Sequence, residues 1–311
     1  MRNGFKTTLF LLSIVVTGSV GYCEEQVPDS GVVELVAVGD VMLARGVNEK
    51  IKRTEPNYPF EKAQDIISQA DIAFCNLEFS ISPRATRKPE SNIFGVKPEE
   101  ARGLGYAGFD IVSLANNHTL DFGKRGLLNT MDFLSQEGIK FAGAGKNPSD
   151  SRLPVVFEVN GVKVAFLAYC LYPMDQVVFR DHDPAIALYD SSRAKELIGK
   201  LRDEVDAIVV SVHWGIEYRK SPTSFQVRIA HQLIDAGAKL ILGHHPHVVQ
   251  KIEEYHGGVI AYSLGNFVFD QHLPETKKSV IFKATLSKKG VTEFSTLPIQ
   301  IVRFQPTPEK D

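Results

Sequence analysis

The sequence is poor in cysteine, with only Cys23, Cys75 and Cys170 among its 311 residues. No two of them have the Cys-x-x-Cys spacing typical of a thiolate-bound structural zinc, which argues against that kind of site. Cys75 and Cys170 lie in the apolar, strand-like segments IAFCN and LAYCL, as buried free cysteines usually do. A disulfide between these two stays an alternative in an oxidising compartment.

The sequence also lacks an excess of charge of either sign, since its formal net charge is -2. No clustered basic face stands out, so we expect no nucleic-acid partner. A hydrophobic content of 43% excludes disorder as the main state of the chain. Internal repeats and long linkers are absent as well, and residues 32–305 are therefore predicted to form one α/β domain.

The N-terminal segment differs from the rest of the chain. Residues 1–23 combine the basic residues Arg2 and Lys6 with an apolar run that ends in small residues. This layout is typical of a secretory signal peptide, with a retained single-span anchor as the alternative. Bulky Tyr22 argues against lipid attachment at Cys23. We therefore expect an exported protein, periplasmic or extracellular, whose membrane association, if any, is through this segment.

Strand-like and helix-like segments alternate from residue 31 onward. Apolar runs predict buried strands at residues 32–40, 71–78, 109–118, 205–214 and 238–247. Helical spacing predicts helices at residues 60–70, 98–108, 123–138, 191–204 and 224–237. Asn160-Gly161 predicts a hairpin, and the tail over residues 248–290 has an all-β pattern. We expect two sheets, the hairpin and the tail in the second, with helices on both outer faces.

Polar side chains recur at the carboxyl ends of five of these strands. They are Asp40; Asn76 and Glu78; Asn116, Asn117 and His118; His213; and His244, His245 and His247. The carboxyl ends of parallel strands lie along one edge of a sheet, where ligands bind. Each residue alone has a plain structural explanation, such as a helix cap, a turn or a core histidine. Five segments that place such groups in the same structural position predict one ligand site instead.

The types of these side chains predict a metal centre. Carboxylates, carboxamides and neutral imidazoles without a thiolate suit Mn, Fe, Zn or Mg, so we expect one or two divalent ions as cofactor. In the segment ILGHHPHVVQ, Pro246 separates His245 from His247 and biases His245 to an extended conformation. Both rings can then flank one point. If the strand geometry continues, His244 points away from His245 and is the least certain ligand.

The ordered motifs VGDVMLAR, NLE, ANNH, HWG, GHHPH and YSLGNFVFDQ resemble a known family. The chain looks like the capsule-synthesis CapA / poly-γ-glutamate synthesis family over residues 33–286, and that family belongs with the calcineurin-like metallophosphoesterases. The resemblance implies a four-layer αββα sandwich, metallophosphatase-like, in agreement with the alternation described above. It also implies a role in the biosynthesis of a capsule or of poly-γ-glutamate.

The same resemblance implies roles for single residues. Glu78 would bridge two ions, where the wider superfamily uses an aspartate. His118 would stay off the metal and act as general acid or donor toward a leaving oxygen, with Asp121 orienting its ring. The implied ligands are Asp40, Glu78 and His247 for the first ion, and Glu78, Asn117, His213 and His245 for the second.

One motif departs from the superfamily pattern, which opens with Asp-x-His. Here Met42 stands two residues beyond Asp40, so the first ion has one imidazole fewer and the centre could hold one ion or two. Arg45 and Asn266 are candidate anion or substrate contacts; the alternatives are an exposed arginine at a helix start and a turn residue. The loops at residues 82–98 and 172–184 either line the mouth of the site or simply connect elements.

Two functions fit these observations. The first is a metal-dependent hydrolase or transferase that acts on a phosphoester or on a linkage of an envelope polymer, and His118 supports it. The second is a non-catalytic accessory protein that binds, exports or anchors an anionic capsule polymer, and the missing imidazole beside Asp40 supports that one. A third reading is a degenerate relative whose metal serves stability alone.

Overall fold

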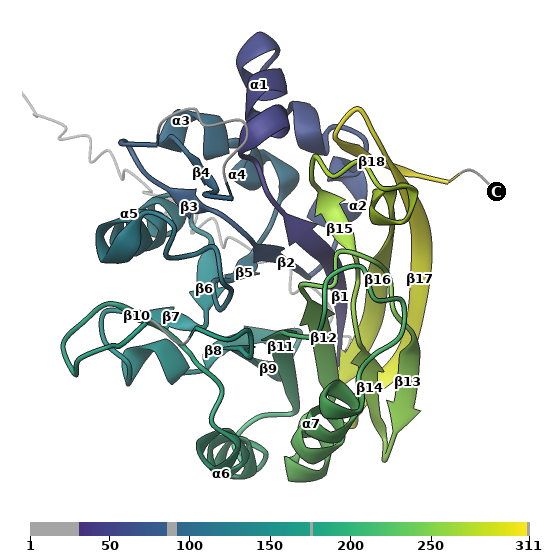
Figure 1. The fold of residues 1–311 in the computed structure, drawn as a ribbon. Coiled ribbons are helices and arrows are strands. Elements are labelled where there is room, and N and C mark those ends of the chain that lie inside the picture. Colours follow the sequence, from purple (N-terminus) through teal and green to yellow (C-terminus); the bar gives the residue numbers. More distant parts are fainter. Residues whose placement is uncertain (1–30, 86–91, 175–176, 310–311) are drawn as a thin grey trace, which may run out of the picture.

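The computed structural model describes residues 31–85, 92–174 and 177–309, and two sheets lie face to face between helices (Figure 1). Residues 1–23, interpreted above as a signal peptide or anchor, lie outside the described residues. Within the described ranges, no helix is both long and apolar enough to cross a membrane. The predicted four-layer αββα arrangement is confirmed by the order of the elements and by their packing.

The first sheet has the strand order β18-β17-β16-β1-β2-β5-β6, and β15 pairs with the end of β1. Strands β1, β2, β5 and β6 are parallel, whereas β16, β17 and β18 are antiparallel to their neighbours. The bounds are β1 Val32–Val41, β2 Ile72–Leu77, β5 Ile111–Ser113, β6 Lys140–Ala142, β15 Asn266–Val268, β16 Lys278–Ser287, β17 Gly290–Val302 and β18 Gln305–Pro308.

The second sheet has the order β13-β14-β12-β11-β9-β8. Its central strands are parallel, and the predicted hairpin joins β8 to β9 through Asn160 and Gly161, with φ of 50° and 71°. These positive values are those of the tight turn that Asn-Gly favours. The bounds are β8 Val155–Val159, β9 Val162–Cys170, β11 Ala207–His213, β12 Leu240–His244, β13 Ile252–Tyr255 and β14 Gly258–Ala261.

Helices form the two outer layers. Side chains alternate along β11, so Ile208, Val210 and Val212 pack with the apolar faces of α6 and α7, while the residues between them face the first sheet. In Figure 1, α6 and α7 lie beside the second sheet, and α1, α3, α4 and α5 lie on the far side of the first. The helices are α1 Arg45–Arg53, α2 Gln64–Ser68, α3 Pro98–Ala101, α4 Gly103–Ala107, α5 Gly123–Gln136, α6 Ser191–Leu201 and α7 Ser224–Ala236.

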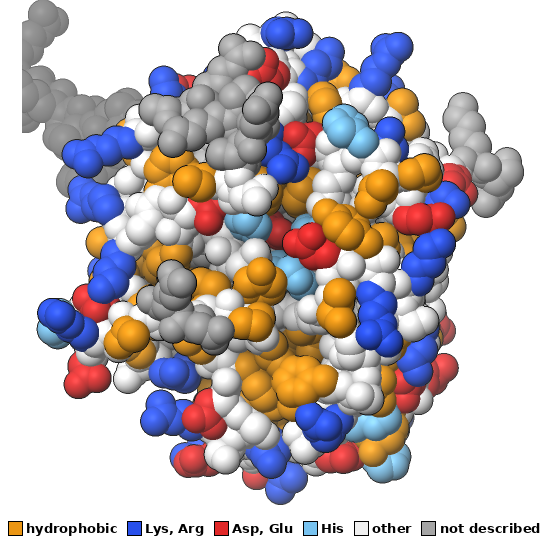
Figure 2. Space-filling model, in the orientation of Figure 1, with side chains coloured by type: hydrophobic (Ala, Val, Ile, Leu, Met, Phe, Trp, Pro, Cys, Tyr) orange, Lys and Arg blue, Asp and Glu red, His pale blue; other side chains and the backbone are white. Residues whose placement is uncertain are grey.

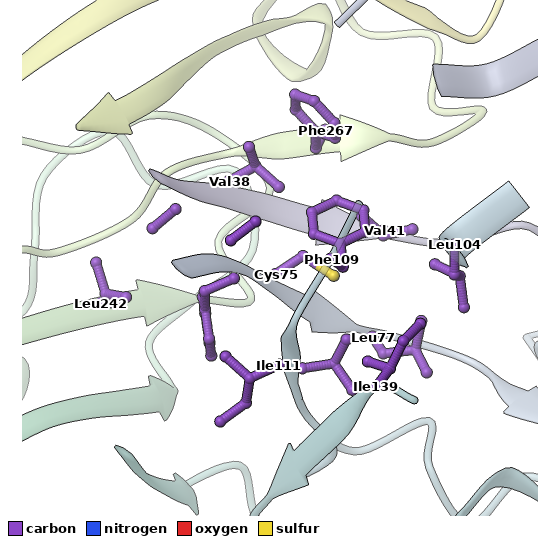
Figure 3. Packing of buried hydrophobic residues seen from close by; sticks show 14 of the residues in the cluster. Val38, Val41, Cys75, Leu77, Leu104, Phe109, Ile111, Ile139, Leu242 and Phe267 are labelled. Atoms are coloured by element: carbon purple, nitrogen blue, oxygen red, sulfur yellow. The ribbon is translucent and has the colours of Figure 1, made fainter. Parts of the chain in front are cut away.

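Apolar side chains fill the space between the two sheets and the space between the first sheet and its helices. Figure 3 shows part of this cluster, with Leu104 of α4, Cys75 of β2 and Leu242 of β12. Phe74 of the first sheet stacks on Phe166 of the second, with ring centroids 6.1 Å apart. Cys75 and Cys170 are buried free thiols, as the sequence predicts, and are not joined in a disulfide. Burial raises the pKa of Cys170 to about 12, so this thiol stays protonated and unreactive at neutral pH.

Two expectations about the fold were wrong in part. The β-rich tail does not belong to one sheet: β13 and β14 extend the second, but β15 to β18 join the first, because β16 pairs with β1 over six consecutive positions. The segment at residues 82–98 is more than a surface loop, since β4 (Gly95–Val96) pairs with β3 (Ser80–Ile81). A second small pair joins β7 (Ala144–Gly145) to β10 (Ala185–Ile186).

Candidate metal centre

The predicted strand ends meet at one edge of the sandwich. Parallel pairing puts Asp40 of β1 level with Asn76 of β2, and His213 of β11 level with His244 of β12. Residues from the two facing sheets therefore converge there. Figure 2 shows histidine and acidic side chains together in the middle of this face, with hydrophobic side chains around them.

Asp40 lies at the bottom of the centre and is fully buried. Asn76 Nδ2 donates to its Oδ1 over 2.9 Å, and the backbone N–H of His245 donates to its Oδ2 over 3.3 Å. The imidazole of His247 comes within 3.2 Å of the same Oδ2. Asp40 is thus held in one orientation by neighbours from two other strand ends, those of β2 and β12.

Glu78 is also fully buried, and its Oε1 has no hydrogen-bond partner among the described residues. That oxygen lies 3.6 Å from His247 Nε2 and 4.0 Å from His118 Nε2. Leaving a buried carboxylate oxygen unpartnered is costly. Two ligands that each lie about 2.1 Å from one ion are roughly 3.0–3.4 Å apart, so Glu78 and His247 are close to the separation that a shared cation needs.

His213 and Asn117, both predicted ligands, are in direct contact. His213 Nε2 lies 2.7 Å from Asn117 Oδ1, and its ring centroid lies 4.8 Å from that of His245. His245 Nδ1 is buried and has no hydrogen-bond partner within the described ranges. The implied ligand set of the second ion is therefore assembled in one place.

The histidine loop, residues 244–247, differs from its prediction in two ways. His245 is not extended: its φ is 94°, and that of His247 is 57°. His244 ends β12 and points into the space between the sheets, as the strand alternation requires, but its Nδ1 comes within 3.3 Å of Asp40 Oδ1. Because the chain leaves the strand with a positive φ, His245 turns back to the same centre. His244, fully buried with no hydrogen bond to either ring nitrogen from the described residues, joins the candidate ligands.

Two groups of side chains bring their ligand atoms within 4.8 Å of one another. The inner group is Asp40, Glu78 and His213, all buried; the outer group is Glu217, His245 and His247, of which Glu217 is exposed. Sequence reasoning did not single out Glu217. The signal that could have found it is its position in the sequence: it is a carboxylate four residues beyond His213, in the loop that contains the HWG motif. Both groups combine carboxylate and imidazole, which fits a divalent ion.

The sequence of this chain is similar to those of known proteins. The sequence profile of the bacterial capsule synthesis protein PGA_cap family matches residues 34–271. The chain belongs to this family. It is 33% identical to the capsule biosynthesis protein CapA of Bacillus anthracis, over 88% of this chain and 69% of that protein. It is 32% identical to the PGA biosynthesis protein CapA of Bacillus subtilis, over 88% and 73% of the two chains.

Among solved structures, the NAD nucleotidase of Haemophilus influenzae has the same fold. It superposes with a TM-score of 0.53 at 12% identity, over 86% of this chain and 56% of that one. The fold of this PGA_cap member is therefore metallophosphatase-like, as predicted.

Met42, at the position of the missing imidazole, is fully buried, and its sulfur accepts from the backbone N–H of Ala44 over 3.0 Å.

Burial and charge set the protonation of the PGA_cap centre. Burial raises the pKa of Asp40, but contacts with His244 and His247 outweigh it and hold that pKa well below its ordinary value. Burial, and then the charge of Asp40, raise the pKa of Glu78. Burial, and then the charge of His247, lower the pKa of His245 to about 4. Neutral imidazoles around carboxylates that repel one another are the environment that a cation stabilises.

The predicted pair of His118 and Asp121 forms beside the two ligand groups. His118 Nδ1 lies 2.9 Å from Asp121 Oδ2, which also accepts from the backbone N–H of Phe94 over 2.6 Å. The Phe94 ring stacks on His118 at 3.9 Å. Phe94, from the predicted loop at residues 82–98, therefore lines the site. Tyr172, from the predicted loop at residues 172–184, lines it as well, since it packs edge-on against His245.

The two predicted substrate contacts have different surroundings. Arg45 lies with its guanidinium carbon 4.6 Å from the centroid of the Phe94 ring and forms an ion pair with Asp270, a residue to which the sequence assigns no role. Asn266 is fully buried and holds the histidine loop, with its Oδ1 2.9 Å from His247 Nδ1. Substrate contact by either residue stays a prediction.

Asn266 is in turn held by Gln271, another residue that sequence reasoning missed. Asn266 Nδ2 donates to Gln271 Oε1 over 2.9 Å, and Gln271 Nε2 donates to the hydroxyl of Tyr218 over 3.3 Å. With Asn266 Oδ1 accepting from Nδ1, His247 presents Nε2 to the centre. This chain fixes the orientation of one predicted ligand.

Proposed function

We propose that this PGA_cap protein is a metal-dependent hydrolase of capsule or poly-γ-glutamate biosynthesis that acts on a phosphoester or on an anionic envelope polymer. The observation that carries the proposal is the His118–Asp121 pair. It lies next to the ligand groups, yet its imidazole is tied to a carboxylate that belongs to neither group. A histidine whose ring is oriented by a carboxylate is the arrangement that general acid–base catalysis uses.

The candidate ligands would hold one or two divalent ions; they are Asp40, Glu78, Asn117, His213, His244, His245 and His247. When bound, such ions acidify a water molecule and neutralise charge on phosphoryl oxygens. The chain itself supplies the proton. With Nδ1–H donated to Asp121, the imidazolium form of His118 carries its second proton on Nε2, which faces the centre; passing that proton to a leaving oxygen leaves the ring neutral.

Arg45 supports an anionic substrate. Its side chain is only 19% exposed, and its guanidinium packs on Phe94, the ring that stacks on His118. Positive charge is thus separated from the proposed proton donor by one aromatic ring. Asp270 pairs with this guanidinium, so a phosphate or carboxylate group at the mouth of the centre would be attracted to it in competition with Asp270.

The proposal is tested by His118→Ala in the purified, manganese-loaded protein, with phosphoesters and poly-γ-glutamate as substrates. The expected result is a loss of turnover of about 100-fold or more with the metal content unchanged. His256→Ala is the matched control, because His256 is an exposed histidine paired with Asp235 on the surface. Unchanged turnover in His118→Ala would remove the support for the hydrolase.

Met42 favours a second candidate, a non-catalytic accessory protein that binds or anchors an anionic polymer. A centre short of one imidazole can bridge polymer carboxylates through its metal without turnover. In that case the metal-loaded wild-type protein would bind poly-γ-glutamate but hydrolyse no substrate of the panel. His118→Ala would then bind the polymer as well as the wild type does.

We propose further that residues 1–23 direct export, so that the domain works in the periplasm or outside the cell. The basic and apolar pattern of that segment supports this. Cell fractionation of the expressed full chain, with the mass of the recovered protein, tests it. A loss of about 23 residues would indicate cleavage, full length in the membrane fraction would indicate an anchor, and full-length protein in the cytoplasm would refute export.

A further inference from the structure

The loop that follows β11 brings an unassigned carboxylate to the centre. Glu217 places a carboxylate oxygen within 4.8 Å of ligand nitrogens of both His245 and His247. We infer that Glu217 is a metal ligand, which adds an oxygen donor in a centre that lacks the imidazole replaced by Met42. This inference rests on the metal centre of the proposed function and names a further residue that holds it.

Backbone hydrogen bonds fasten the Glu217 loop to the histidine loop. The N–H of Trp214 donates to the carbonyl of His244 over 3.1 Å, and the N–H of Tyr218 donates to the carbonyl of Pro246 over 2.8 Å. Glu217 lies between these two anchors, directly before Tyr218. The carboxylate is therefore carried by a loop that follows the two histidines, and its proximity does not depend on the side chain alone.

The backbone of the Glu217 loop has positive φ angles on both sides of Glu217. Gly215 has a φ of 91°, and Tyr218 has a φ of 63°, in the region that side chains other than glycine rarely adopt. A non-glycine residue in that region is strained and persists where surrounding contacts hold it. Here the hydrogen bond to Pro246 and the contact of the Tyr218 hydroxyl with Gln271 hold it.

The two histidines offer nitrogen atoms that need a partner. His245 Nδ1 is buried without a hydrogen bond from the described residues, and His247 Nε2 is left facing the centre because Asn266 engages Nδ1. Two imidazoles and one carboxylate are a common ligand set for Mn, Fe or Zn. A cation among them would partner the otherwise unsatisfied nitrogen.

The outer group differs from the inner one in its access to solvent. Asp40, Glu78 and His213 are all buried, whereas Glu217 is exposed. An ion held by Glu217, His245 and His247 would therefore be accessible from solvent, and a substrate oxygen or a water molecule could reach it. Glu217 would lie on the solvent side of an ion bound there, and the buried His245 and His247 would lie on its inner side.

The test is a titration of the purified, metal-stripped protein with Mn²⁺. Binding is measured as the decrease of the electron paramagnetic resonance signal of free Mn²⁺. Glu217→Gln keeps the size of the side chain and removes its charge, and the residue is exposed, so the fold tolerates the change. We expect it to remove one bound equivalent or to weaken binding at least tenfold. Glu293→Gln is the control, since it removes the same charge from β17 opposite Thr285, at the far end of β16 from the centre.

Each outcome decides a different statement. If the wild type binds Mn²⁺ and Glu217→Gln binds it equally well, Glu217 is not a ligand, and the proposed function is unaffected. If Glu293→Gln weakens binding as much as Glu217→Gln does, the effect is one of overall charge and the inference fails. A wild-type protein that binds no Mn²⁺ overturns both the metal centre and this inference.

Discussion

Replacing Gly243 with alanine should destabilise the fold directly beneath the metal centre. Gly243 precedes the histidine loop, and a Cβ added there would come within 2.0 Å of the carbonyl oxygen of Tyr262 and 2.8 Å of Trp214 Nε1. Those two atoms are joined by a hydrogen bond of 3.0 Å. The methyl group would therefore press on backbone on one side and on a fully buried indole on the other.

The magnitude follows from these contacts. Overpacking a close-packed core costs about 1–3 kcal/mol, and loss of the hydrogen bond from Trp214 adds about 1 kcal/mol. We expect Gly243→Ala to lower the free energy of unfolding by about 2–4 kcal/mol, measured by urea denaturation. Metal affinity should fall as well, because His244 and His245 follow directly in the chain.

Gly199→Ala is the matched control for this substitution. Gly199 lies inside α6, and nothing lies within 4 Å of a Cβ built on it. Alanine there should raise the free energy of unfolding by roughly 0.5–1 kcal/mol, since it favours the helix. A Gly243→Ala protein within about 0.5 kcal/mol of the wild type would refute the packing argument.

Two further predictions concern pH and metal. Burial raises the pKa of Glu253, but hydrogen bonds from Lys251, His231 and Tyr262 outweigh it and hold that pKa at about 2, below the ordinary 4.5. The contribution of ionised Glu253 to the free energy of unfolding is therefore fully present above pH 4.5 and is lost as the pH falls toward 2. After allowance for solvent screening, Glu253→Gln should lower the free energy of unfolding at pH 7 by about 1–3 kcal/mol, and urea denaturation should show the difference from the wild type shrinking below pH 4.5. Chelation of metal bound at 100-fold above its Kd should lower stability by about 2.7 kcal/mol, or about 5–10 °C in Tm by calorimetry; an unchanged Tm, with metal removal verified by elemental analysis, would contradict the metal centre.

The sequence predicts the framework of the centre well, because strand ends follow from local pattern. An apolar run followed by Asp40 or by His213 places the side chain at a sheet edge once the strands are parallel, and the hairpin at Asn160 depends on two residues alone. The pairing of β16 with β1 is a different matter. It joins residues about 250 positions apart, and nothing in the local pattern of the tail says which sheet it completes.

The details of the centre depend on backbone turns that the residue types alone do not predict. His245 is expected to be extended before a proline, and His244 to point away from it. Instead, His244 reaches Asp40 from the end of β12, and the positive φ of His245 turns that residue back to the same centre. Glu217 and Phe94 reach the site through loops whose course is set by tertiary hydrogen bonds. Alternation along a strand says nothing about either residue.

The centre draws its side chains from positions as far apart as Asp40 and His247, on two sheets that meet only when both are formed. Such long-range contacts require the closure of a long loop of chain, which costs conformational entropy and slows folding. A growing polypeptide therefore has no metal pocket until β12 has been synthesised and docked. If the chain crosses a membrane unfolded, it crosses without its ion, and the metal available at the destination determines what the finished protein carries.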